Sequence, residues 1–194
     1  MPRLGMEPIR RSALVEATIH EIGARGTLDV TVSQIARRAG VSSALAHHYF
    51  GSKDAIFAAA MRHILTLYGA EVRGAMAMAR SPRERLEAII RASFTPQQFR
   101  AETVSAWLNF YVQAQTSAEA RRLLEIYQRR LRSNLLHAFR QIAPQNAPML
   151  ARGFAAMIDG LYLRQALRRG PVEPQAAVEV LLQYLETSLG ESGR

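Results

Sequence analysis

The sequence predicts an all-α fold, and three of its features favour that class. Apolar residues recur at three- and four-residue intervals through most of the 194 residues, as they do along one side of a helix. Residues that begin or end helices, chiefly Ser, Thr, Pro and Gly, stand between these stretches. No stretch is a convincing strand. We therefore expect about nine helices, over residues 7–26, 31–39, 43–50, 53–79, 82–94, 101–114, 117–142, 147–168 and 174–189.

The first helix is expected to brace the two short helices that follow it. It begins at Glu7 and Pro8, because proline lacks the N–H group that would be unsatisfied in a first helical turn. Gly26 ends it. The apolar residues along it are Ile9, Leu14, Ala17, Ile19 and Ile22.

Residues 31–53 have the pattern of a helix-turn-helix. Thr31 is a good N-cap, and Gln34 would complete a capping box. Gly40 can end the first short helix in a left-handed conformation, and Ser42 caps the second. In a helix-turn-helix the second helix lies in the major groove of DNA. The alternative is an ordinary pair of packed helices inside an all-helical protein.

The second short helix would need only a few inward anchors, chiefly Leu45, Tyr49 and Phe50. Free N–H groups at Thr31 and Ser42 could then meet DNA phosphates, as helix N-termini often do. The residues left to face base edges are Ser43, Ala44, His47 and His48. Arg3, in the basic arm before the first helix, either reaches a phosphate or minor groove or belongs to a frayed terminus.

The long helix over residues 53–79 leaves no flexible linker after these helices. We place a domain boundary near residue 54, with a DNA-binding domain over 1–54, its helix-turn-helix at 31–50, and a ligand-binding and dimerisation domain over 55–194. The last two helices are the candidate dimer surface, through an apolar stripe from Val178 to Leu189 with Met157, Leu161 and Leu167. The alternative is that they pack inside one subunit. A two-fold dimer would present two reading helices to a palindromic operator.

One helix face carries the candidate ligand-binding residues. Trp107, Phe110 and Tyr111 lie at positions i, i+3 and i+4, so their rings share a face that could frame a cation. Asp159 stands in an otherwise apolar run, and a buried carboxylate needs a partner or a ligand. Tyr162 follows it by three residues. The alternatives are an aromatic stripe in the core and an Asp159 paired with an arginine across a dimer interface.

Composition excludes several other classes of protein. No apolar run approaches the roughly 18 residues of a membrane span, and no signal peptide is evident. The chain has no cysteine, which fits the cytoplasm, and we expect no membrane partner. The net charge of +9 favours an anionic partner but is spread along the chain. A non-specific DNA-architectural protein would not need the aromatic second domain.

The sequence offers little for an enzyme. There is no His-Glu-x-x-His pattern, no Gly-rich phosphate loop and no Gly-x-Ser-x-Gly elbow, so we expect no catalytic residue, no metal site and no cofactor. His47 and His48 are adjacent and would point about 100° apart in a helix, which makes a poor chelate.

Two runs carry a family resemblance. Ala36-x-x-Ala39-Gly40-Val41-Ser42 and His48-Tyr49-Phe50-x-x-Lys53 resemble the N-terminal signature of the TetR family of repressors. The opening 26 residues, the segment Ala106-Trp107-Leu108 and the segment Ile158-Asp159-Gly160-Leu161 resemble the choline-responsive members, which repress genes for glycine-betaine synthesis. His47 and Leu45 depart from the pattern, which usually has Tyr and often Thr at these positions.

The resemblance implies a dimeric cytoplasmic repressor with choline as its effector. We expect phosphate contacts from Thr31, Ser42, Tyr49 and Lys53. We also expect that an effector bound between the helix of Trp107 and that of Asp159 shifts the long helix after Ser52. The alternative function is a TetR-type repressor of an efflux or other metabolic operon, with a different hydrophobic or cationic ligand.

Overall fold

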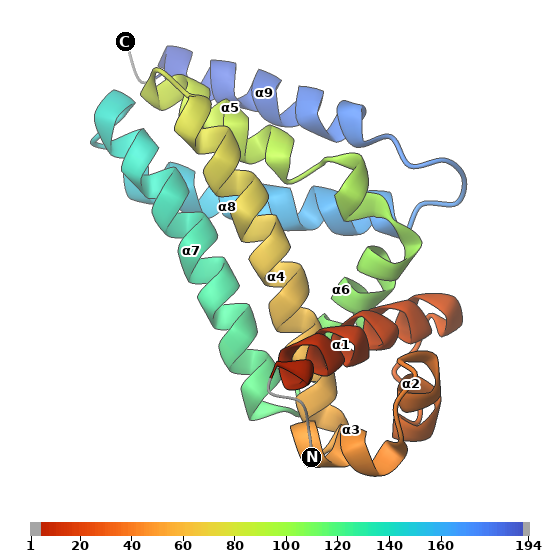
Figure 1. Ribbon diagram of the computed structural model, residues 1–194. Helices are drawn as coiled ribbons and strands as arrows, with labels where there is room; N and C mark the ends of the chain where they lie inside the picture. The colour runs from red at the N-terminus through yellow and green to blue at the C-terminus, as the bar shows by residue number, and fades with distance from the viewer. Residues whose placement is uncertain (1–4, 192–194) are drawn as a thin grey trace. The chain divides into compact units, whose positions relative to one another are not determined.

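The computed structural model describes residues 5–191, and this part of the chain is entirely helical between its turns, as predicted (Figure 1). Arg3 lies outside the described residues. Nine α-helices and one short 3-10 helix, η1, occupy the described range. They are α1 (Met6–Arg25), α2 (Val32–Arg38), α3 (Ser43–Phe50), α4 (Lys53–Met78), α5 (Pro82–Ala92), η1 (Pro96–Phe99), α6 (Ala101–Gln113), α7 (Ala118–Ile142), α8 (Ala147–Ala166) and α9 (Pro174–Glu191).

The predicted capping residues set the helix ends. Thr31 and Gln34 form a complete capping box at the start of α2, and the Ser42 side chain accepts from the N–H of Leu45 at the start of α3. Gly40 takes φ +67°, which residues with a Cβ rarely adopt. No helix of the described residues is long and apolar enough to cross a membrane.

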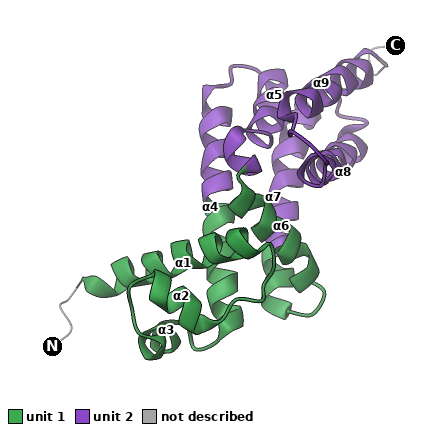
Figure 2. Ribbon diagram, turned by 90° about the vertical axis from the view of Figure 1, so that its right-hand side faces the viewer, with its two compact units in different colours: residues 1–66, 100–123 green, residues 67–99, 124–194 purple. Residues whose placement is uncertain are grey.

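The chain divides into two compact units, residues 1–66 with 100–123 and residues 67–99 with 124–194 (Figure 2). The division falls inside α4 and inside α7. The predicted boundary near residue 54 concerns function, because it separates a DNA-binding domain over 1–54 from a ligand-binding domain over 55–194. This boundary stays a prediction. The helix α4 runs across it from Lys53 without interruption.

A small apolar core holds the three N-terminal helices together in the first unit. Fully buried residues from α1, α2, α3 and α4 meet there, namely Leu14, Ile35, Ala46 and Ile56. The predicted anchors of α3 were partly wrong, because the deeply buried residue is Ala46, while Leu45 is only half-buried and lies outside this core. Adjacent helical residues point about 100° apart, and the small Ala46 lets α3 pack closely.

Ile9, one of the apolar residues along α1, lies on the exposed side of this helix. Its side chain is 61% exposed, whereas Leu14 is fully buried. At 100° per residue, five residues turn the side chain by about 140°, so the two point away from each other.

The helices α1 and α6 make the most extensive helix–helix contact described in the first unit. A Cβ at Gly23 of α1 would lie 2.6 Å from the Cα of Glu102 of α6, closer than real Cβ atoms approach. The Asn109 side chain donates to the carbonyl of Gly26 at 3.1 Å, which satisfies one of the orphan carbonyls beyond α1. The glycine therefore allows α6 to lie against α1.

Replacing Gly23 with alanine is expected to lower the free energy of unfolding by about 1–3 kcal/mol, because the new methyl group overpacks against backbone. Gly74→Ala is the matched control. A Cβ at Gly74 meets nothing within 4 Å, so alanine should stabilise that helix by about 0.5–1 kcal/mol. Urea unfolding at one fixed protein concentration, followed by far-UV circular dichroism, measures both. Equal stability of Gly23→Ala and the unmodified chain would contradict the close contact.

In the second unit, α9 packs against α5 and α8. Val178, Leu181 and Leu185 are buried by this packing, so the predicted dimer stripe from Val178 to Leu189 is wrong as a free surface. Of the predicted dimer surface, Leu167 just after α8 is 65% exposed, and the two helices also leave Met149, Val180 and Tyr184 exposed. Leu67 of α4 is also 58% exposed.

Candidate DNA-recognition helix and effector site

The exposed face of α3 carries three of the four residues expected over bases. Ala44, His47 and His48 are all exposed and lie at positions i, i+3 and i+4, so they share one face. Ser43 is half-buried, and its hydroxyl donates to the Ser33 hydroxyl of α2 at 3.1 Å. The face presented by α3 therefore combines one small residue near its N-terminus with two imidazoles near its C-terminus.

The expected phosphate contacts at the helix N-termini need one correction. The N–H of Thr31 is not free, because it donates to Oε1 of Gln34 at 2.8 Å within the capping box. The Thr31 and Ser42 side chains are exposed, and each accepts from a backbone N–H of its own helix. Their hydroxyl protons remain available to an acceptor, so phosphate contact through the side chains stays a prediction.

The end of α3 is fixed by an arginine that sequence reasoning missed. Nη1 of Arg11, on α1, donates to the carbonyl oxygen of Tyr49 at 2.6 Å. The same guanidinium lies 4.5 Å from the centroid of the Phe50 ring, within the range of a cation–π contact. The sequence did contain a signal for this contact, namely an arginine in the first helix and two adjacent aromatic residues at the end of α3. Arg11 therefore links the C-terminal end of α3 to α1.

Tyr49 and Lys53 flank this end. The Tyr49 ring is half-buried against the N-terminal core, and Nζ of Lys53 lies 5.3 Å from the Phe57 ring centroid. Their predicted contacts with phosphates stay predictions.

The aromatic face of α6 lies in the first unit. Trp107 and Phe110 are buried and Tyr111 is half-buried, with ring centroids 6.0 Å apart for Trp107–Phe110 and 5.7 Å for Trp107–Tyr111. The rings therefore contact one another. The cavity beside Phe110 in this unit has a volume of about 10 Å³, which is about the space of one water.

Asp159 and Tyr162 of α8 belong to the second unit. The Tyr127 hydroxyl, on α7, donates to Oδ1 of Asp159 at 2.7 Å. The Tyr162 hydroxyl donates to the carbonyl of Gln98 at 2.8 Å. Burial raises the pKa of the Asp159 carboxyl, and the bond from Tyr127 opposes that rise. Tyr127 is thus the partner that the sequence required of Asp159 but did not identify.

A second carboxylate lies in the same unit. Glu71 of α4 accepts from the Thr95 hydroxyl at 3.0 Å and from the Gln98 amide at 2.9 Å. The Tyr68 hydroxyl is paired with Ser93 at 2.9 Å, and burial raises the pKa of Tyr68 to about 12. The Tyr68 and Tyr127 ring centroids are 5.7 Å apart. Nothing in the helical spacing of α4 distinguishes Glu71 from a solvated residue.

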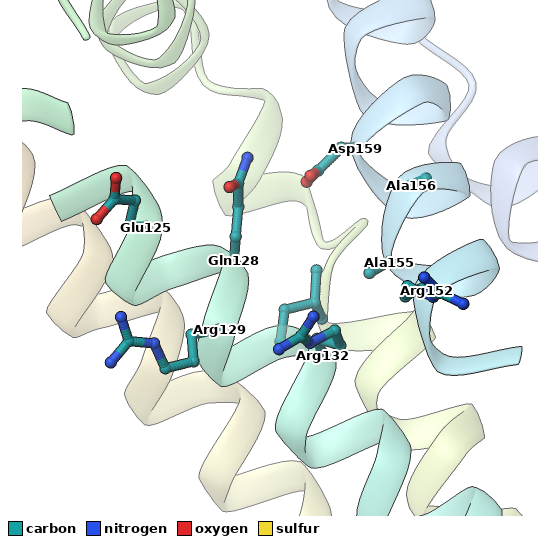
Figure 3. Close-up of a pocket in the computed structure, with 9 residues that line it drawn as sticks. Glu125, Gln128, Arg129, Arg132, Arg152, Ala155, Ala156 and Asp159 are labelled. Carbon is teal, nitrogen blue, oxygen red and sulfur yellow. The ribbon is translucent and has the colours of Figure 1, made fainter. Parts of the chain in front are cut away.

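Asp159 also lines a pocket between α7 and α8, with a volume of about 430 Å³ (Figure 3). The other lining residues are Glu125, Gln128, Arg129, Leu131, Arg132, Arg152, Ala155 and Ala156. Sequence reasoning missed the three arginines, because in the pattern of α7 and α8 they resemble an ordinary solvated face. No group of histidine and acidic side chains among the described residues could hold a metal ion.

The sequence matches two family models. One, described as bacterial regulatory proteins of the tetR family, matches residues 14–60. The other, described as BetI-type transcriptional repressor, C-terminal, matches residues 82–190. Together they cover the N-terminal helices and most of the remaining chain.

Curated relatives match the whole length. The chain is 53% identical over 194 residues to the HTH-type transcriptional regulator BetI of Rhizobium meliloti (strain 1021), which covers 100% of this chain and 96% of that protein. It is 50% identical over 190 residues to BetI of Brucella anthropi, with 97% and 98% covered.

Solved structures share the fold. A transcriptional regulator from Pseudomonas aeruginosa PAO1 has a TM-score of 0.82 at 28% identity, over 97% of this chain and 93% of that one. A transcriptional regulator from Saccharomonospora viridis, solved in complex with choline, has a TM-score of 0.77 at 24% identity, over 91% and 95%. The predicted TetR-like, all-helical architecture is therefore confirmed.

Proposed function

The chain belongs to the BetI type of the TetR family of transcriptional repressors, and on that premise we propose that it represses genes of glycine-betaine synthesis as a homodimer that responds to choline. It is a DNA-binding helix-turn-helix regulator and not an enzyme. Because it acts on DNA, we place it in the cytoplasm.

The exposed face of α3 is the observation that carries the DNA-binding part of the proposal. Ala44 lets the helix approach base edges closely, and His47 and His48 can each donate or accept a hydrogen bond there. Ser43 lies at the edge of this face, held by Ser33. We assign the positioning contacts with phosphates to Thr31, Ser42, Tyr49 and Lys53, which flank the face.

A homodimer is favoured by the apolar residues that α8 and α9 leave exposed. Val180 and Tyr184 are four residues apart on one side of α9, and Met149 lies at the start of α8. A second copy would cover them. Two copies of α3 would then meet successive major grooves of a palindromic operator, a whole number of turns of about 34–36 Å apart.

Choline is favoured as effector by the chemistry around Asp159. A quaternary ammonium cannot donate a hydrogen bond, so it is recognised by carboxylates and by ring faces. Asp159 supplies the carboxylate and Tyr127 a ring beside it. The Saccharomonospora viridis regulator binds choline in its crystal structure. Contacts of the effector with Tyr162 and with the ring face of Trp107, Phe110 and Tyr111 remain part of the proposal.

Choline can relieve repression only if it binds more tightly to the conformation that does not fit DNA. The helix α4 begins at Lys53, directly after the recognition helix, and carries Tyr68 and Glu71 in the second unit. A shift of this continuous helix would move α3 with it.

Fluorescence anisotropy with the DNA upstream of the chain's own gene tests the proposal. We expect specific, salt-sensitive binding that scrambled DNA of equal length competes poorly, and a lower affinity when choline is added. Equal affinity for scrambled DNA would contradict a sequence-specific repressor. Specific binding without a choline effect would favour the alternative, a repressor of an efflux or other metabolic operon with a different ligand.

A further inference from the structure

The pocket between α7 and α8 separates its charges along its length. Figure 3 shows Glu125, Gln128 and Asp159 in its upper part and Arg129, Arg132 and Arg152 in its lower part. Leu131, Ala155 and Ala156 complete the wall. The pocket therefore has an acidic end and a basic end.

The two helices repeat the same spacing. Glu125 and Arg132 of α7 are seven residues apart, as are Arg152 and Asp159 of α8. Seven residues are two helical turns, so the backbone positions of the two charges on each helix are about 10 Å apart. Residues seven apart lie on one helix face, which explains why both ends open into one pocket.

The lower end is held differently from the upper end. Asp159 is half-buried and fixed by the Tyr127 hydroxyl, whereas the three arginines are exposed and none has an ion pair among the described residues. Arg132 lies between the other two in Figure 3. A guanidinium group offers a planar fork of donors that matches a carboxylate.

We propose that this pocket binds a dipolar effector, a quaternary ammonium carboxylate whose cation lies against Asp159 and whose carboxylate meets Arg132. This inference rests on the proposed function, from which it takes the cation site at Asp159. It adds a carboxylate to the proposed ligand. The 430 Å³ of the pocket is more than a small cation of the size of choline needs. A ligand with charges at both ends would match both ends of the pocket, and choline would match only one.

Isothermal titration calorimetry at one pH and salt concentration tests this with three probes that share a trimethylammonium head. They are choline, trimethylammonioacetate and 4-trimethylammoniobutanoate. We expect the butanoate to bind about tenfold more tightly than choline, which is the size of one charge-assisted hydrogen bond. The acetate should gain less, because its two charges are too close together to reach both ends.

Arg132→Gln should abolish the advantage of the butanoate over choline, because choline has no carboxylate that could lose this contact. Arg140→Gln, at an exposed position of α7 outside the pocket, is the matched control and should change neither affinity. Equal affinities of choline and the butanoate in the unmodified protein would overturn the inference and leave choline as effector. A loss of dimer in Arg132→Gln, seen by sedimentation, would assign Arg132 to subunit association and also overturn it. If none of the probes binds, the inference and the choline part of the proposed function both fail, while DNA binding stands.

Discussion

Ala44→Glu is expected to abolish specific operator binding while the protein stays folded. Ala44 is exposed in the first turn of α3, so a larger side chain meets no core residue there. A carboxylate near a helix N-terminus is also favourable for the free protein. At the DNA, the same carboxylate would face phosphates and acceptor-rich base edges at both half-sites. We expect a loss of affinity of at least about 100-fold, because errors at single positions typically cost about 1–3 kcal/mol each.

The matched control for Ala44→Glu is Ala77→Glu. Ala77 is an exposed alanine near the C-terminal end of α4. It adds the same charge to the protein, so it measures the general effect of net charge on DNA affinity. Anisotropy titration and thermal unfolding of both variants separate the two causes. Similar losses of affinity in both variants, or unfolding of Ala44→Glu, would contradict a recognition role for this face.

Asp159→Asn is expected to remove choline binding without destabilising the protein. Asparagine keeps an oxygen that accepts from the Tyr127 hydroxyl, so the bond between α7 and α8 survives. The negative charge that attracts a cation is lost, and we expect the affinity for choline to fall at least about tenfold. Calorimetric titration and thermal unfolding measure the two effects. Unchanged choline affinity in Asp159→Asn would exclude this carboxylate as the cation site.

The pH dependence of stability and of choline affinity provides a second test of this prediction. Burial raises the pKa of Asp159, so the folded protein holds this proton more tightly than the unfolded chain does. The stability contributed by the protonated group is present at low pH and is lost as the pH rises through the raised pKa. The melting temperature of Asp159→Asn should therefore equal or exceed that of the unmodified protein at neutral pH. Choline affinity should fall as the pH is lowered through the same pKa, because the carboxyl then loses the negative charge that attracts the cation.

Tyr127→Phe separates the two roles of this pair. It removes the hydroxyl that donates to Asp159 and leaves the negative charge of the carboxylate in place. The protein should become less stable at neutral pH, because a partly buried carboxylate loses its bond.

The N-terminal helices could be predicted well because their signals are local. The capping box at Thr31, the left-handed Gly40 and the N-cap Ser42 act within a few residues, and all three are confirmed. Which residue anchors α3 was less predictable, because Ala46 and Leu45 both fit an apolar position. The choice depends on how closely α3 approaches α1 and α2, which is a tertiary property.

The effector site depends on pairs far apart in the chain. Tyr127 and Asp159 are separated by 32 residues, and Tyr162 and Gln98 by 64. Periodicity predicts which face of a helix is apolar but not which neighbour it meets, so it identified Asp159 as needing a partner without identifying Tyr127. The stripe on α9 was assigned to a dimer for the same reason, because an apolar face looks alike whether α5 or a second subunit covers it.

The central claim is that two copies of α3 are presented together to one duplex. Hydroxyl-radical footprinting of the operator, combined with sedimentation of the complex to count protein chains, tests this claim most directly. We predict two chains for each operator and two protected major grooves, related by two-fold symmetry and a whole number of turns of about 10 base pairs apart. A single chain that protects a single groove would contradict it.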